Sequence, residues 1–184
     1  MKSFRNKLIE ILPQSSEEQR KAMAIEMMRS QCLPSQFKDL LLCEKTGRRF
    51  SWMISNLAQL NPEYLVRDLP TLWEIAEKVE GFDFKSSFTN YWRYCGVPSS
   101  QETIAINYLM EVLEKNKHTT TIQSRALRVM QKVILQHPDL SQELVAILIA
   151  NYPLYERGMQ QRVGKFLKHK KSELLQFALF IFLF

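Results

Sequence analysis

The sequence contains little glycine, proline or cysteine. Its 184 residues include 5 Gly, 7 Pro and 3 Cys. No glycine- or proline-rich stretch marks a linker, so we expect one helical-repeat domain spanning residues 1–184. The cysteines and histidines are scattered along the chain without CxxC spacing, so neither set resembles a disulfide framework or a zinc site. These residues are Cys32, Cys43, Cys95, His118, His137 and His169.

The chain also lacks the motifs of common catalytic sites. GxGxxG, GxxxxGK[ST], GxSxG, HExxH and CxxC are all absent. We therefore predict no catalytic residue, no metal-ligand set and no cofactor, and we favour a function that is not enzymatic. The first residues carry Lys2, Arg5, Lys7 and Glu10, which interrupt any signal-peptide apolar segment. A cytoplasmic location is the simplest expectation.

What is present favours helices. Hydrophobic residues make up 46% and charged residues 24% of the chain, which is typical of a globular protein. Leu, Met, Glu, Gln and Lys are abundant while Val and Thr are few, a bias toward helix-forming residues. Ser15 and Glu18 stand at capping-box spacing before the apolar positions Met23, Ala24 and Met27. The composition and these signals predict an all-α fold.

Helix-breaking residues divide the chain into helical hairpins. The first helices of these pairs are predicted to begin near residues 17, 48, 84, 120 and 155, a period of 31–36 residues. "RFSWMISNLAQLNPEYL" (49–65) aligns with "RALRVMQKVILQHPDLS" (125–141), each a helix, a proline-acid turn and a returning helix. We therefore expect a right-handed α-solenoid of about five helical hairpins in residues 15–184, with residues 1–14 as an N-terminal capping helix. A plain helical bundle is the alternative.

The hairpins resemble HEAT or armadillo repeats. "RRFSWMISNLAQLNPEYLVRDLPTLWEI" (48–75) resembles the divergent repeats of the DNA-alkylation-repair superfamily, and the likeness extends over about residues 17–184. The resemblance implies a stacked fold and, in glycosylases of that superfamily, aromatic side chains beside a carboxylate. Asp68 and Asp83 are the aspartates nearest the tryptophans in sequence, but a turn and a helix cap explain them. No catalytic residue is transferred from the family.

Positive charge is concentrated in one part of the chain. The sequence has 25 basic and 19 acidic residues, an excess of six basic ones. Residues 125–171 contain nine basic and three acidic residues, so this segment alone has the same excess. Arg125, Arg128 and Lys132 share one face of a predicted helix, and Lys165 with Lys168 are expected beside them on the next hairpin. These five residues are candidate contacts to an anionic partner. A solvated basic face is the alternative.

Two tryptophans are candidate aromatic contacts. Trp52 and Trp92 take places equivalent to Arg128 in the alignment of the repeats. Aromatic and basic side chains along one ridge can stack on nucleic-acid bases and neutralise phosphates. The alternative is that both rings pack between neighbouring hairpins, where large aromatic residues usually lie.

The sequence ends on "SELLQFALFIFLF", which has almost no polar side chain. From Leu174 to Phe184 only Gln176 is polar, and these eleven residues are too few to span a membrane as a helix. We expect the second helix of a fifth hairpin, whose residues Phe177, Phe180, Phe182 and Phe184 form the interface of a homodimer. Burial against the chain's own stack, or a natural protein that continues further, are the alternatives.

These patterns predict a non-enzymatic helical-repeat scaffold that mediates macromolecular interaction. Another protein is the first candidate for its partner. The alternative is a nucleic-acid-binding protein related to the HEAT-like glycosylases of DNA alkylation repair.

Overall fold

The computed structural model consists of helices throughout the residues that it describes. It describes the backbone of residues 2–115 and 117–182 and the side chains of residues 3–115 and 117–170. Those ranges contain eleven α-helices and five short 3-10 turns, and no strand. The all-α prediction is confirmed for this part of the chain. None of the helices in it is both long and apolar enough to cross a membrane.

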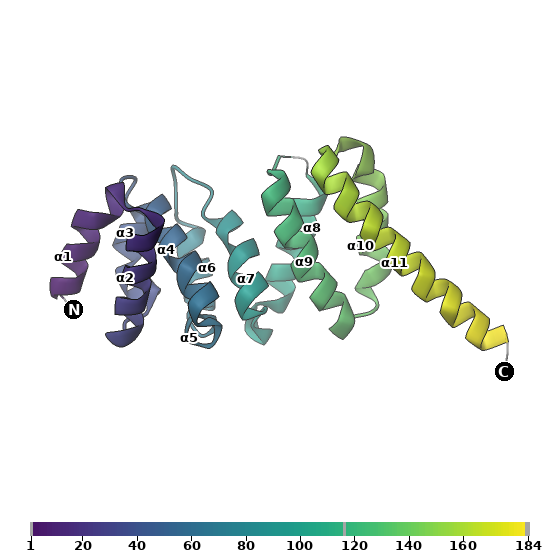
Figure 1. Cartoon of the computed structure of the whole chain (residues 1–184), viewed down its shortest axis with the longest axis horizontal. Coiled ribbons are helices and arrows are strands. Elements are labelled where there is room, and N and C mark those ends of the chain that lie inside the picture. The colour runs from purple at the N-terminus through teal and green to yellow at the C-terminus, as the bar shows by residue number, and fades with distance from the viewer. Residues whose placement is uncertain (1, 116, 183–184) are drawn as a thin grey trace. The chain divides into compact units, whose positions relative to one another are not determined.

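Residues 1–105 and 106–184 form two compact units (Figure 1). The helices of the first unit are α1 (Lys2–Ile11), α2 (Glu17–Arg29), α3 (Lys38–Leu42), α4 (Gly47–Leu60), α5 (Pro62–Val66), α6 (Leu69–Ala76) and α7 (Phe88–Cys95). The boundary falls within α8 (Glu102–Glu114), and the second unit continues with α9 (Thr120–Gln136), α10 (Leu140–Asn151) and α11 (Arg157–Phe182). Helices α2, α4, α9 and α11 begin within two residues of predicted starts. The expectation of a single domain stays a prediction.

Helix α2 begins with a capping box that differs by one residue from the predicted one. The Ser16 hydroxyl accepts the backbone N–H of Gln19 at 3.2 Å, and the Gln19 side chain accepts the N–H of Ser16 at 2.8 Å. Ser15 is buried instead, and its hydroxyl donates to the Leu12 carbonyl at 2.9 Å. The box therefore joins Ser16 to Gln19 rather than Ser15 to Glu18, because Ser15 already closes the preceding turn.

Asn61 and Pro62 separate α4 from α5, as the sequence predicted. The Asn61 N–H donates to the Leu57 carbonyl at 2.9 Å and ends α4. The Asn61 side chain then accepts the N–H of Tyr64 at 3.0 Å at the start of α5. Pro62 occupies the first position of that helix. A backbone N–H at this position would have no hydrogen-bond partner within the helix, so its absence in proline costs nothing.

Helix α4 is central to the packing of the first unit. It contacts both α2 and α7, so the first helices of three successive pairs lie in a row (Figure 1). Phe50, Met53, Ile54 and Leu57, four apolar residues of α4, are completely buried. Burying each such side chain contributes about 1.5–3 kcal/mol to stability before entropy is counted.

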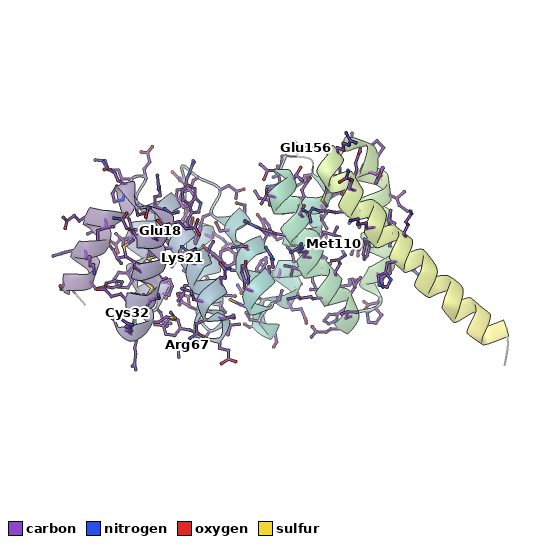
Figure 2. All side chains as sticks on the ribbon, in the orientation of Figure 1. Glu18, Lys21, Cys32, Arg67, Met110 and Glu156 are labelled. Carbon is purple, nitrogen blue, oxygen red and sulfur yellow. The ribbon has the colours of Figure 1, made fainter. Side chains whose placement is uncertain are left out.

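Hydrogen bonds join consecutive pairs within the first unit. The hydroxyl of Tyr64 donates to the Cys32 carbonyl at 2.8 Å, and the Arg67 guanidinium lies 4.9 Å from the Tyr64 ring centre. Figure 2 shows Cys32 and Arg67 at the same end of this unit. The hydroxyl of Tyr91 donates to the Ser51 carbonyl at 2.9 Å. Because the Tyr91 donor is buried and the Tyr64 donor is half-buried between helices, these bonds fix how one pair sits on the next.

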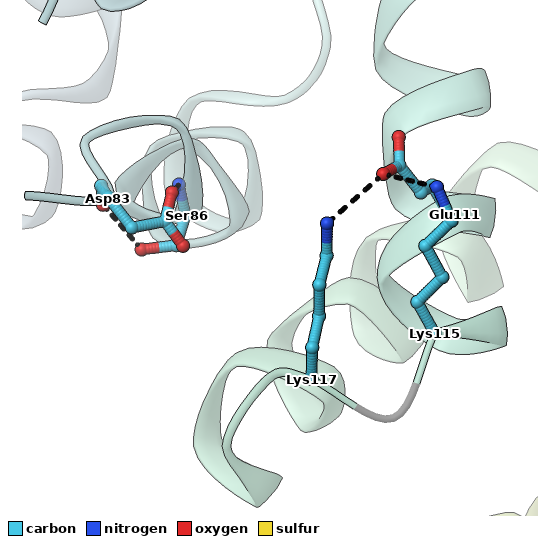
Figure 3. A network of polar contacts seen from close by, with 5 residues as sticks. All are labelled: Asp83, Ser86, Glu111, Lys115 and Lys117. Carbon is cyan, nitrogen blue, oxygen red and sulfur yellow. Dashed lines mark hydrogen bonds and ion pairs between the residues drawn. The ribbon is translucent and has the colours of Figure 1, made fainter. Parts of the chain in front are cut away.

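Of the two aspartates that the sequence explained locally, Asp83 has a local role, whereas Asp68 binds a residue far away in the sequence. Asp83 accepts the N–H of Ser86 at 3.1 Å and caps the turn before α7 (Figure 3). Asp68 is buried just before α6 and accepts both the N–H of Ser35, at 2.9 Å, and the Ser35 hydroxyl, at 2.5 Å. It thereby joins the turn Pro34–Phe37 to the start of α6.

The second unit has its own core and its own polar links. Leu144 and Leu148 of α10, with Met159 and Val163 of α11, are completely buried. The buried hydroxyl of Tyr155 donates to the Leu113 carbonyl at 2.5 Å. At the end of α8, Glu111 pairs with Lys115 at 2.9 Å and with Lys117 at 3.5 Å (Figure 3).

Helix α11 corrects the expectation of a fifth hairpin. Its 26 residues run without a break from Arg157 to Phe182. The apolar residues near the end of the chain therefore continue the first helix of the predicted hairpin and do not form a second, returning helix. The sequence "KHKKSE" (168–173) changes from basic to apolar character but contains neither proline nor glycine. A change in polarity does not end a helix, since the backbone hydrogen bonds are unaffected. Within the described residues the chain therefore ends on one long helix rather than on a hairpin.

Candidate functional site

A pocket of about 280 Å³ lies between α9 and α11 in the second unit. Four basic side chains line it: Arg128 from α9, and Arg162, Lys165 and His169 from α11. The three residues of α11 stand at i, i+3 and i+7, so they lie on the face that α11 turns toward α9. The pocket thus gathers positive charge from two helices that are separate in sequence.

The remaining lining of the pocket is neutral. Ser124 and Gln131 of α9 add a hydroxyl and an amide, and the Ser124 hydroxyl donates to the sulfur of Met159 at 3.8 Å. Leu127 and Phe166 are 3% and 6% exposed, so they form an apolar base. The pocket thus combines polar and charged groups with two buried apolar side chains, a combination that favours an anion with an apolar stem.

The pocket has no acidic group to compensate its charge. Helix α9 contains no acidic residue, and α11 contains none before Glu173. Within the part of the chain described, no carboxylate forms an ion pair with Arg128, Arg162 or Lys165. Glu156, directly before α11, accepts a hydrogen bond from the Thr120 hydroxyl instead. The lining therefore presents a net positive potential to solvent.

The structure brings together two of the five basic residues that the sequence singled out. Arg128 and Lys165 line the pocket, whereas Arg125, Lys132 and Lys168 do not. Arg125 is half-buried on α9, and Lys132 and Lys168 are exposed. Sequence reasoning missed two further basic residues, Arg162 and His169. Their spacing with Lys165 repeats that of Arg125, Arg128 and Lys132, and this signal could have identified them.

Trp52 lies at the surface of the first unit between arginine side chains. Its side chain is 43% exposed, and the guanidinium carbons of Arg20 and Arg49 lie 5.2 and 5.3 Å from its ring centre. Both guanidiniums donate to the Ser15 carbonyl, at 2.5 and 2.6 Å. Partial burial, followed by the neighbouring charge of Arg49, lowers the pKa of Arg20. This cluster places an exposed aromatic ring beside two positive charges in the first unit.

Trp92 is placed differently, and this corrects its assignment as a candidate contact. It is completely buried and stacks on Trp73, with ring centres 5.3 Å apart. Phe88 packs against both rings, at 4.9 Å from Trp73 and 5.3 Å from Trp92. The alternative that the sequence left open, packing between helices, therefore describes Trp92. A ring without solvent exposure cannot contact a partner of the folded unit.

The hydrophobic interface predicted at the end of the chain cannot be placed. Phe184 lies outside the described residues, and the side chains of Phe177, Phe180 and Phe182 lie outside the described side chains. The homodimer through these residues stays a prediction.

A second pocket, of about 420 Å³, lies in the first unit between α3 with its preceding turn and α6. Its charged lining residues are Lys38, Glu74 and Lys78, so both signs are present. Glu74 offsets part of the positive charge there, and the site is less selective for anions than the pocket of the second unit.

Metal ligands do not gather in the described part of the chain. Within it, no group of three or more His, Cys, Asp or Glu side chains could hold a metal ion. Burial raises the pKa of the Cys95 thiol to about 12, which keeps it protonated and unreactive at neutral pH.

Comparisons with protein-family models, with curated proteins and with solved structures found no significant match to this chain. The resemblance to HEAT-like and alkylation-repair repeats accordingly stays a prediction from the sequence.

Proposed function

We propose that the protein is a non-enzymatic scaffold of HEAT-like repeats, a right-handed α-solenoid capped at its N-terminus by α1. The row formed by α2, α4 and α7 in the first unit supports this proposal. So do the contacts of α6 with the turn before α3, because second helices then also stack on one another. Phe4 and Leu8 of α1 are buried while its other face is exposed, as a capping helix requires.

The partner is another protein, bound through an acidic segment at the pocket between α9 and α11. The observation that carries this proposal is the absence of acidic residues from both lining helices up to Glu173. Positive residues on exposed helices are commonly paired with acidic ones three or four positions away. Here Arg128, Arg162 and Lys165 have no such partner within their helices, so an external anion would compensate them.

The proposal is tested by titrating a fluorescent glutamate-rich peptide with the protein and measuring anisotropy. We expect binding that weakens as salt is raised, because the attraction is screened. Replacing Arg128 and Lys165 by Glu should weaken binding at least about tenfold, since each tenfold step corresponds to 1.4 kcal/mol.

The matched control replaces Arg157 and Lys168 by Glu. Both residues are exposed on α11 outside the pocket, and the change in net charge is the same. Equal weakening by the two double variants would mean that only net charge matters. The pocket would then have no specific role.

A nucleic acid is the second candidate partner, favoured by Trp52 with its two arginines. An exposed indole can stack on an unpaired base while guanidiniums neutralise a phosphate. This alternative predicts that Trp52→Ala weakens binding of single-stranded oligonucleotides and that affinity falls steeply with salt. A cytoplasmic location and a homodimer remain part of the proposal without further support.

A further inference from the structure

We infer that the pocket between α9 and α11 recognises a phosphorylated side chain on the partner protein. This inference rests on the proposed function and specifies the chemistry of the same site. It follows from the number of donors in the pocket, from their geometry and from the size of the space that they enclose.

The pocket offers more positive charge than a carboxylate can compensate. Arg128, Arg162 and Lys165 carry three positive charges, and no acidic residue lines the pocket. A carboxylate brings one negative charge and two oxygens. A phosphate monoester carries a charge of about −1.5 to −2 at neutral pH and has three acceptor oxygens. The dianion therefore matches the lining better than the side chain of Asp or Glu does.

The two arginines come from different helices, which favours a group with several acceptor oxygens. Arg128 extends from α9 and Arg162 from α11. Each guanidinium presents a planar fork of N–H donors that can bind two oxygens at once. Phosphate can accept both forks on different oxygens and leave one for Lys165 or for the Ser124 hydroxyl.

The volume and the base of the pocket favour a single side chain as its occupant. A space of about 280 Å³ is slightly smaller than a typical ligand site. Leu127 and Phe166 below it can contact the carbon atoms between a phosphate and its backbone. Nucleic acid would instead need a row of phosphate contacts, and Arg125, Lys132 and Lys168 lie outside this pocket.

The experiment compares three fluorescent peptide pools with the same randomised flanks and either Ser, Glu or phosphoserine at the centre. Anisotropy titrations of the full chain should show the phosphoserine pool binding at least about tenfold more tightly than the Glu pool. The double variant Arg128→Lys with Arg162→Lys keeps the charge but removes both forks. It should lose this preference while still binding the Glu pool. Arg157→Lys, outside the pocket, should retain the preference, and circular dichroism verifies that each variant is folded.

The outcomes separate this inference from the proposed function. Equal binding of the phosphoserine and Glu pools overturns the phosphate inference and leaves an acid-binding scaffold. No binding of either pool overturns both. Tighter binding of a single-stranded oligonucleotide than of the phosphoserine pool, with the same dependence on Arg128 and Arg162, assigns the pocket to nucleic acid and overturns the inference as well.

Discussion

At the scale of single residues, Gly47 at the start of α4 is the glycine with the least space around it. A Cβ atom there would lie 2.5 Å from the Leu41 carbonyl oxygen and 2.7 Å from Cε1 of Phe82. The first of these atoms belongs to the backbone and cannot simply rotate away. We expect Gly47→Ala to lower the free energy of unfolding by about 1–3 kcal/mol, measured by urea denaturation.

Gly164→Ala is the control, and it should change the free energy of unfolding in the opposite direction. Gly164 lies inside α11, where an added Cβ would come no nearer than 3.8 Å to the Tyr152 hydroxyl. Removing glycine from a helix interior should raise the free energy of unfolding by about 0.5–1 kcal/mol. A Gly47→Ala variant as stable as the native chain would show that residues 41 and 82 do not pack as described.

Asp68 gives the protein a pH-dependent contribution to stability. Burial raises the pKa of its carboxyl, and the two hydrogen bonds from Ser35 offset part of that effect. The pKa of Asp68 is higher in the folded than in the unfolded chain. The contribution of Asp68 to the free energy of unfolding is therefore fully present at pH values below the unfolded pKa. It is lost as the pH rises through the folded pKa. Asp68→Asn stays neutral, so its stability relative to the native chain should increase with pH across this window.

Urea denaturation at a series of acidic pH values measures the difference. Asp139→Asn is the control, since it removes an exposed carboxylate from a turn of the second unit. The free energy of unfolding should therefore depend on pH differently in Asp68→Asn and in Asp139→Asn. Parallel profiles for Asp68→Asn and the native chain would mean that Asp68 titrates alike in the folded and unfolded states.

Among the elements, the junction of α4 and α5 depends on one side chain. Asn61 supplies the oxygen that accepts the Tyr64 N–H at 3.0 Å. Asn61→Ala leaves this donor without its cap and should lower the free energy of unfolding by about 1 kcal/mol. Asn61→Asp keeps the acceptor and should be nearly neutral. Thermal or urea unfolding of the two variants distinguishes the cap from a general effect of substitution.

The starts of α2, α4, α9 and α11 could be predicted because local chemistry determines them. Proline and a capping residue end α4 and start α5 whatever surrounds them. The end of the chain was misjudged because nothing in residues 168–173 interrupts a helix, although the polarity changes there. The capping box of α2 was displaced by one residue because Ser15 and Ser16 have equal capacity to cap. Only the burial of Ser15 decides between them.

The candidate site could be predicted only in part, because it depends on how two helices meet. Helical spacing indicated that Arg125, Arg128 and Lys132 share a face, but not which of them points at α11. Contact between α9 and α11 selects Arg128 and adds Arg162 and His169. Likewise, the surface position of Trp52 and the burial of Trp92 follow from packing that a pattern of single residues does not contain.

At the scale of the whole molecule, the two units differ sharply in charge. Residues 1–105 hold 14 basic and 13 acidic residues, whereas residues 106–184 hold 11 and 6. The second unit therefore carries five of the six excess positive charges. An anionic partner approaching in solution would be drawn toward it, and attraction of this kind raises association rates at low salt.

The two units also differ in what they contribute to light absorption and emission. All three tryptophans belong to the first unit: Trp73 and Trp92 stack in its core, and Trp52 lies at its surface beside two guanidiniums. Tryptophan emission consequently reports on the first unit alone, while circular dichroism in the far ultraviolet reports on both. Iodide, which the guanidiniums attract, would quench Trp52 and leave the buried pair emitting at shorter wavelength. The chain thus contains its own optical label, with which the unfolding of one half can be followed without labelling the other.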